Sequence, residues 1–337
     1  MKKLLRNLFG SGREEEKRSA SDAMSGREQI VTNSEKSNLS TDPDHVNRQA
    51  DTLKFDAIRA MNMGELVFAT EALRKAMELR PEFETRYYLT EALLRRHLTE
   101  EALAQMNLLL EEVPMHTATL LNRAKLRLEQ NDPSRALEDC GTGIESTSEL
   151  EEQALFLYYG ASAMKDMKNL KDALCLLKQA IEKNDAFIPA RLLRARMLID
   201  LERYEEATRD LDWVAASDPE EEQVPMLRAR LFMLEGKQQN AMQAYEELLS
   251  LDPFNEEGHC GIATLMIKEG RSAEAETFLR EAIEEMPVQR NLILMLVEIL
   301  ENKGQTQEAA EWRAKLPEAE VESEAVNFND LYKGNLY

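Results

Sequence analysis

The 337-residue chain has few of the residues that build disulfide-stapled or metal-centred folds. It contains three cysteines, Cys140, Cys175 and Cys260, which stand far apart without a CxxC pair, and its four histidines occur singly. This scarcity argues against a disulfide framework and against the ligand spacings of zinc sites. Because free thiols are typical of a reducing compartment, we expect a cytoplasmic protein that holds neither a metal nor a cofactor.

Glycine and basic residues are also scarce. Glycine accounts for 13 residues, while hydrophobic residues make up 43% of the chain and charged residues 31%, a balance that favours amphipathic helices over turn-rich sheet. Lysine and arginine total 42 against 63 acidic residues, which gives a net charge of −21. Such a charge repels phosphate backbones, so nucleic acid is not expected as a partner. The alternative explanation of the imbalance is solubility alone.

No apolar run is long enough to cross a bilayer. At the start of the chain Leu4, Leu5, Leu8 and Phe9 share a helical face opposite basic residues, as in a weak interfacial helix that touches a membrane surface. The residues that follow, up to about 45, contain hardly any large apolar side chain and cannot offset the entropy of ordering. We therefore predict a disordered leader over residues 1–49 with a short amphipathic start.

What the chain has in abundance is a repeated pattern of small residues. Eight alanines recur at intervals of 33 to 37 residues: Ala69, Ala102, Ala136, Ala173, Ala207, Ala241, Ala275 and Ala309. Twelve residues before them stand Ala57, Thr90, Ala124, Ala161, Ala195, Ala229, Ala263 and Val297. Antiparallel helices approach closely only where side chains are small, so the pattern predicts eight helix pairs that cross at these positions.

Proline and glycine punctuate the same register. Proline stands twelve residues after five of the eight alanines, at Pro81, Pro114, Pro219, Pro253 and Pro287, where it ends a helix. Glycine stands five residues before four of them, at Gly64, Gly236, Gly270 and Gly304, where a helix C-cap needs positive φ. Each unit therefore reads as helix, tight turn, helix and stop.

These features together resemble the tetratricopeptide repeat (TPR) family over residues 50–317. The unit from Glu256 to Pro287 keeps Gly270, Ala275, Leu279 and Ala282 in the family's order. The resemblance implies an all-α fold, a right-handed superhelical solenoid of about eight helix-turn-helix repeats. It also implies that the first helix of each repeat lines a concave groove, where protein or peptide segments dock.

Two segments depart from the regular array. Three extra residues between Ala136 and Ala173 are expected to lengthen the second helix of the third repeat or the loop after it. The acidic end, residues 318–337, is expected to form either a tail or a capping helix that uses its apolar side chains, namely Phe328, Leu331 and Tyr332. Its carboxylates are also candidate occupants of a basic groove when no partner is present.

No constellation of catalytic residues is recognisable. The histidines lack HExxH spacing, no nucleophile elbow or phosphate-binding loop is present, and carboxylate pairs such as Glu205–Glu206 fall on predicted exposed helix faces. We therefore expect no enzyme activity and no catalytic, cofactor-binding or metal-binding residues.

The candidate partner-binding residues are basic and aromatic side chains at groove-facing places, namely Tyr87, Lys125, Tyr158, Arg196 and Arg230. The three cations share the ninth place of repeats three, five and six, where they can pair with carboxylates of a partner. The alternative is that they neutralise acidic neighbours within the chain. The two tyrosines serve either an interface or the packing between repeats.

Further groove-facing residues are expected at the fifth places of the repeats, among them Leu121, Leu192 and Cys260. The whole pattern predicts a non-enzymatic scaffold or adaptor that binds an acidic or amphipathic segment of another protein. The alternative is a peripheral membrane-associated assembly factor tethered by residues 1–9. Either a capping helix or a second copy would cover the ends of the array, so the oligomeric state stays open.

Overall fold

The computed structural model describes residues 43–316 as two compact units, one before and one after the boundary between Glu82 and Phe83. The predicted leader up to residue 42, its amphipathic start and the acidic segment 318–337 lie outside the described residues. In the smaller unit α2 (Pro43–Met63) and α3 (Leu66–Leu79) form one helical hairpin. Arg80, which follows α3, bonds to Asp51 on α2 and closes this hairpin at its open end.

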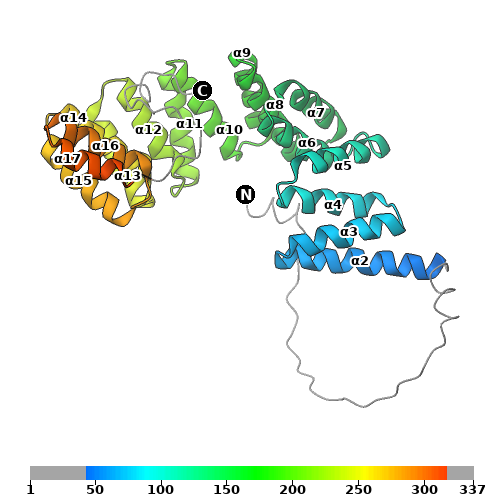
Figure 1. Cartoon of the computed structure of the whole chain (residues 1–337). Helices are drawn as coiled ribbons and strands as arrows, with labels where there is room; N and C mark the ends of the chain where they lie inside the picture. The colour runs from blue at the N-terminus through cyan, green and yellow to red at the C-terminus, as the bar shows by residue number, and fades with distance from the viewer. Residues whose placement is uncertain (1–42, 317–337) are drawn as a thin grey trace, which may run out of the picture. The chain divides into compact units, whose positions relative to one another are not determined.

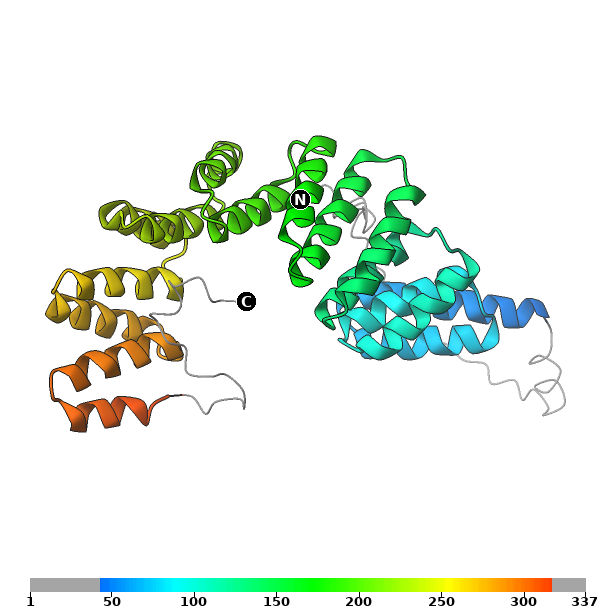
Figure 2. The same cartoon turned by 90° about the horizontal axis from the view of Figure 1, so that it is seen from above.

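The larger unit continues as seven successive helix pairs within the described residues (Figure 1). Figure 2 shows the last two pairs, coloured orange to red, as consecutive antiparallel hairpins. The pairs are α4 (Phe83–Arg95) with α5 (Thr99–Glu112), α6 (Thr117–Glu129) with α7 (Pro133–Ser146), α8 (Leu150–Asp166) with α9 (Leu170–Lys183), α10 (Ile188–Asp200) with α11 (Tyr204–Ser217), α12 (Gln223–Leu234) with α13 (Gln238–Leu251), α14 (Glu256–Lys268) with α15 (Ser272–Glu285), and α16 (Arg290–Asn302) with α17 (Thr306–Arg313). Residues 43–316 contain no strand, so the predicted all-α solenoid of helix pairs is confirmed.

The small residues lie where the two helices of each pair cross. All eight alanines of the second helices are at most 1% exposed, and the six alanines of the first helices are fully buried. Thr90 and Val297, which replace alanine in two first helices, are buried as well. A larger side chain at any of these positions has no free volume to enter, because helix crossings of this kind are close-packed.

The turn inside each pair uses one residue with positive φ, always five residues before the alanine of the second helix. Glycine fills this place in four pairs, as expected from the sequence. In the other four it is taken by residues with side chains, namely His97, Asn131, Lys168 and Glu202, with φ between 57° and 62°. The left-handed conformation is costly for residues that carry a Cβ atom, so these four turns store local strain.

Seven of the eight second helices end at one common place whether or not a proline follows, while the last, α17, ends earlier at Arg313. Those before the five prolines and those of α7 and α9, which lack the proline, all end ten residues after their buried alanine. The end therefore depends on the geometry of the pair, and proline only reinforces it.

Two boundaries differ from the predictions. The first helix begins at Pro43, so residues 43–49, assigned to the leader from their polarity, are helical; Pro43 suits a first helical position because its missing N–H has no partner there. The three extra residues of the fourth unit lengthen neither α7 nor its loop. They extend the start of α8, which has 17 residues where α4, α6 and α10 have 13, and the fourth additional helical residue comes from a loop before α8 that is one residue shorter than those before α6 and α10.

Candidate partner-binding face

The first helices of successive repeats contact one another, α6 with α8, α10 with α12 and α14 with α16. Side chains at the predicted groove-facing places, and a few neighbours on the same first helices, interact from one repeat of the larger unit to the next. We call this set the first-helix face. Its members are Lys125, Tyr158, Tyr159, Arg196, Asp200, Gln223, Arg230 and Glu257.

Lys125 lies at the beginning of the face, on α6. Its Nζ is 5.2 Å from the centroid of the Tyr159 ring on α8, a cation–π contact between neighbouring repeats. Burial lowers the pKa of Lys125, and the carboxylate of Glu129 acts against that shift. Within residues 43–316 no carboxylate lies within 4 Å of this ammonium group.

The two tyrosines of α8 form an aromatic pair in the middle of the first-helix face. The rings of Tyr158 and Tyr159 pack edge to face at 5.1 Å, and Tyr158 makes a second such contact with Phe187 at 5.5 Å. Burial raises the pKa of both hydroxyls, that of Tyr159 to about 12. Both side chains are half-buried, so Tyr158 packs between repeats and still reaches the surface.

Arg196 lies next along the face, on α10. Its charge acts against the burial that raises the pKa of Tyr158. One terminal nitrogen of Arg196 donates a hydrogen bond to Oε1 of Gln223 on α12, at 3.2 Å. Among the described residues Arg196 has no ion pair, since no carboxylate lies within 4 Å of it.

Arg230 occupies the corresponding place on α12 but has a carboxylate partner. Its terminal nitrogen lies 2.8 Å from Oδ1 of Asp200 on α10, so this ion pair joins two repeats. The alternative given for the basic residues, neutralisation of acidic neighbours, therefore describes Arg230. It does not describe Lys125 or Arg196.

Glu257 on α14 completes the face. Its side chain is exposed, yet burial by the surrounding atoms raises its pKa, while Arg230 and Arg196 act in the opposite direction. The two arginines and Glu257 thus share one electrostatic environment without a direct ion pair between them among the described residues.

Tyr87 does not belong to this set. It lies on α4 in a separate aromatic cluster, in which its ring contacts Tyr88 at 6.1 Å and His116 at 5.5 Å, and Phe83 contacts His116 at 5.0 Å. The fifth-place residues Leu121, Leu192 and Cys260 are also not available to a partner, because they are less than 10% exposed and pack against the neighbouring repeats. Burial also raises the pKa of the Cys260 thiol to about 12, which removes it as a nucleophile near neutral pH.

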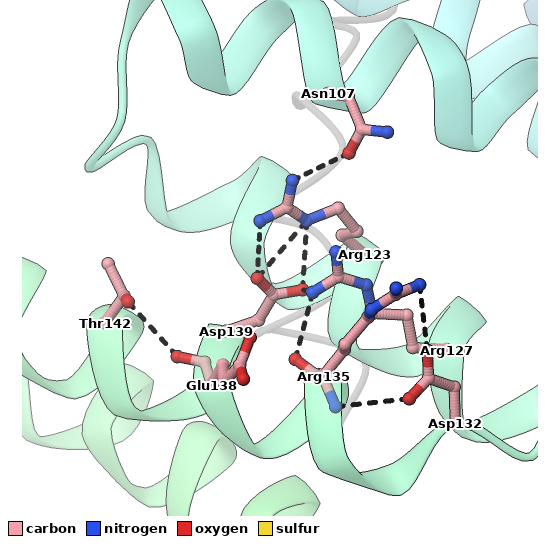
Figure 3. Close-up of polar contacts among 8 residues, drawn as sticks. All are labelled: Asn107, Arg123, Arg127, Asp132, Arg135, Glu138, Asp139 and Thr142. Atoms are coloured by element: carbon pink, nitrogen blue, oxygen red, sulfur yellow. Dashed lines mark hydrogen bonds and ion pairs between the residues drawn. The ribbon is translucent and has the colours of Figure 1, made fainter.

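Each ninth-place cation has an arginine two residues before it, and the structure gives the two members of such a pair different roles. Arg123, two residues before Lys125, turns toward the second helices (Figure 3). Its guanidinium bonds to both oxygens of Asp139 on α7 at 2.6–3.2 Å and to Asn107 on α5 at 2.8 Å. Arg127 adds a bond of 2.7 Å to the same carboxylate.

The same arrangement, an arginine of the first helix bonded to a buried aspartate of the second helix, recurs two repeats later. Arg194, two residues before Arg196, bonds to Asp210 on α11 through two parallel contacts of 2.6 and 2.7 Å. Asp139 and Asp210 both stand three residues after the buried alanine of their helix, and both are buried. Bidentate pairs of this kind fix the angle between two helices. The sequence carried this signal, an Asp in the second helix matched to an Arg in the first, and it was missed.

Sequence reasoning also missed Asp200, Gln223 and Glu257 on the face itself. Gln223 and Glu257 occupy the second place of their repeats, which is groove-facing, and could have been found from that register. Asp200 stands four residues after Arg196, one helical turn away, but pairs with the arginine of the next repeat. A pairing of this type depends on the stacking of repeats, which spacing along the chain does not show.

A family model described as a tetratricopeptide repeat matches residues 192–256. This part of the chain is tetratricopeptide repeat sequence. The matched segment includes Arg196, Asp200, Gln223 and Arg230, so half of the first-helix face lies on recognised TPR sequence. No curated protein matches the chain.

Solved structures of tetratricopeptide repeat proteins and pilus factors agree with this chain in fold. A tetratricopeptide repeat protein from Parabacteroides merdae is 21% identical with a TM-score of 0.61, over 75% of this chain and 99% of that one. PilW, a type IV pilus biogenesis factor, is 14% identical with a TM-score of 0.55, over 64% and 98%. PilF of Pseudomonas aeruginosa is 18% identical with a TM-score of 0.53, over 63% and 96%. At these identities the likeness concerns the fold alone.

Two further properties concern residues 43–316. None of their helices is both long and apolar enough to cross a membrane. They also contain no cluster of three or more His, Cys, Asp or Glu side chains arranged to hold a metal ion. The three cysteines are unpaired, with Cys140 and Cys260 buried and Cys175 exposed.

Proposed function

We propose that this TPR protein is a non-enzymatic scaffold that binds an acidic segment of another protein on its first-helix face. The observation that carries the proposal is the state of Lys125 and Arg196. In a chain with 21 more acidic than basic residues, these two face cations have no carboxylate within 4 Å among the described residues. A partner's carboxylate would supply the missing charge.

The surroundings of the two cations favour such a contact. Both are partly buried, and partial burial strengthens a charge-assisted hydrogen bond relative to one in open water. Between them lie half-buried tyrosines, a residue type that interfaces favour because it combines apolar area with a hydroxyl group. The TPR fold supports a protein-interaction role in general, and these residues support acidic partners in particular. The unpaired thiols favour a reducing compartment, and we place the protein in the cytoplasm.

The test compares capture of partners from native lysate by three full-length chains. The first is the wild type, and the second is the face variant Lys125→Ala, Arg196→Ala, Arg230→Ala. The third is a control that removes three exposed cations from the second helices, Lys171→Ala, Lys178→Ala, Arg209→Ala. The control changes the net charge as much as the face variant does but leaves the face intact.

We expect the face variant to bind the captured partner more weakly by about 1–3 kcal/mol, since charged hydrogen bonds at partly desolvated sites contribute about that much. The control should bind like the wild type. Added salt should weaken the wild type more steeply than the face variant, because screening acts on the charges that the variant lacks. Equal affinity of the wild type and the face variant would place the binding surface elsewhere.

A further inference from the structure

The helical hairpin α2–α3 exposes several large apolar side chains. On α2, Phe55 and Met63 are 60% and 67% exposed, and on α3, Val67 and Phe68 are 64% and 53% exposed. Phe55, Arg59 and Met63 are four residues apart and follow one side of α2. Single exposed apolar residues are ordinary, but a group of them on one short hairpin marks an interaction surface.

The place of Phe55 has equivalents in the larger unit, two residues before the small crossing residue of each first helix. Leu227 takes this place on α12 and packs in one cluster with Leu211 of the repeat before it. Gly261 takes it on α14, where an added Cβ would lie 2.3 Å from the ring of Tyr245 on α13, again in the preceding repeat. This place therefore faces the preceding repeat.

The places of Met63 and Phe68 face the same way. Lys303 stands at the place of Met63 in the last described repeat, six residues before the buried alanine, and its Nζ lies 2.5 Å from a carboxylate of the repeat before it. Glu308 stands at the place of Phe68 and accepts a hydrogen bond of 2.6 Å from Arg280 of the preceding repeat. Phe55, Met63 and Phe68 thus occupy three places through which a repeat contacts the one before it. We call these three residues the hairpin patch.

The apolar character of the patch is peculiar to the first repeat. At the place of Phe68 the seven later repeats carry a charged or amide side chain, namely Glu101, Arg135, Asp172, Glu206, Asn240, Glu274 and Glu308. A terminal repeat normally presents a polar outer face to water, which keeps an array soluble. The hairpin patch departs from this rule, so we expect another apolar surface to cover it.

A second copy of the same hairpin is the occupant that the structure favours. The places of the patch are those that contact a helix pair elsewhere in the chain, so a helix pair suits them. The last described pair, α16–α17, exposes no large apolar side chain and offers no matching surface. Two hairpin patches, in contrast, are both apolar and match each other about a two-fold axis.

Charge does not oppose this contact. Residues 43–82 carry seven acidic and six basic side chains, a net charge of −1, whereas the whole chain carries −21. Arg59, which lies between Phe55 and Met63, is already paired with Asp56 at 2.9 Å. The hairpin is therefore a place where two copies of this acidic chain can approach without strong repulsion.

We propose that two copies of the chain associate through their hairpin patches, each hairpin standing where a preceding repeat would pack. A contact between two hairpins is small by the standard of stable complexes, so the association depends on concentration. The pair presents two first-helix faces, which raises its avidity for a partner with two acidic segments. No residue of the first-helix face takes part, so the inference is independent of the proposed function.

The first experiment is sedimentation velocity of full-length chains over a range of concentrations, at low and at high salt. The patch variant replaces the three apolar residues by serine, Phe55→Ser, Met63→Ser, Phe68→Ser. The matched control removes three equally exposed apolar side chains from loops of the larger unit, Met115→Ser, Phe254→Ser, Val288→Ser.

The second experiment locates the contact by cross-linking. Cys175→Ser removes the exposed natural thiol, and Arg59→Cys then places one thiol beside the patch. Lys178→Cys in the same background is the control, since the side chains of Arg59 and Lys178 are 73% and 70% exposed. A short bismaleimide joins two copies only where their introduced thiols come close together.

We expect the wild type to form dimers as its concentration rises, and the patch variant to need at least about tenfold more protein, because removal of central aromatic residues weakens an interface strongly. The matched control should dimerise like the wild type. Added salt should leave the dimer intact or strengthen it, since screening reduces repulsion between the acidic chains and does not weaken apolar contacts. The chain with Arg59→Cys should cross-link, and the chain with Lys178→Cys should not.

Three results would overturn the inference. The first is a wild type that stays monomeric, or a dimer that the patch variant does not weaken. The second is a monomeric wild type that dimerises once Leu4, Leu5, Leu8 and Phe9 are replaced by serine, which would assign the patch to the start of the chain itself. The third is a monomeric wild type that captures a lysate protein which the patch variant loses, which would assign the patch to a different protein.

Discussion

At the scale of single residues, the carboxylate of Asp139 is a buried charge with well-placed partners. It is 2% exposed and is contacted by Arg123 and Arg127, which are themselves mostly buried. Burial of charges is costly, and the cost is offset only when each charge has its partners in good geometry. This carboxylate therefore fixes the position of α7 against α6 (Figure 3).

Removing this carboxylate should cost far more than removing an exposed one. Asp139→Ala leaves two guanidinium groups without their partner, and we expect the free energy of unfolding to fall by about 3–5 kcal/mol. The control is Asp212→Ala, which breaks the 2.7 Å ion pair with Arg228 at a carboxylate that is 62% exposed. That change should cost about 1 kcal/mol or less. Urea unfolding followed by circular dichroism measures both, and similar losses would show that the buried clamp contributes little.

At the scale of the helical hairpin, the sequence was sufficient to predict the helix pairs. The alanines at the crossing points and the prolines after the second helices are local signals, because each follows from the packing of one pair. The strained turns were predictable only where glycine occupies them. Where Glu202 or Lys168 occupies the turn, the backbone still adopts positive φ because the packed helices on either side impose it.

This difference gives a test with opposite signs at equivalent positions. Glu202→Gly relieves a left-handed conformation at φ 58° and should raise the free energy of unfolding by about 1 kcal/mol. Gly236→Ala imposes the same strain at φ 74° and should lower it by about 1–2 kcal/mol, although no atom lies within 4 Å of the added Cβ. Thermal unfolding of both variants beside the wild type decides the matter. A fall for both would mean that the Glu202 side chain stabilises the turn in another way.

Contacts between repeats were the part that the sequence could not provide. The ninth-place cations share one place in their repeats, yet their surroundings differ: Lys125 lies on an aromatic ring, Arg196 on an amide and Arg230 on a carboxylate. Each of these partners comes from the neighbouring repeat. Their identity depends on the stacking of helices, so it becomes visible only in three dimensions.

At the scale of the whole molecule, the larger unit is built from contacts between neighbouring helices. The first helices pack mainly against their own second helices and against helices of the adjacent repeats, and the core of this unit is divided into successive clusters. A fold of this kind is stabilised by the sum of its repeats and of the interfaces between neighbours. Damage to one repeat is therefore expected to stay local.

Ala229→Trp tests this locality. Ala229 lies fully buried on α12 in the cluster with Tyr245, Leu248 and Ile262, and an indole there has no volume to fill. Overpacking of this kind costs about 1–3 kcal/mol or more, which should speed hydrogen exchange in α10–α15, the damaged repeat and its two neighbours. Exchange in α4–α7 should be unchanged, because α8–α11 lie between that segment and the damaged pair along the chain. Mass spectrometry of peptic fragments resolves the two regions, with Ala229→Gly as a control that lacks the added bulk. If α4–α7 lost protection as much as α12 and α13, the larger unit would unfold as one cooperative block rather than repeat by repeat.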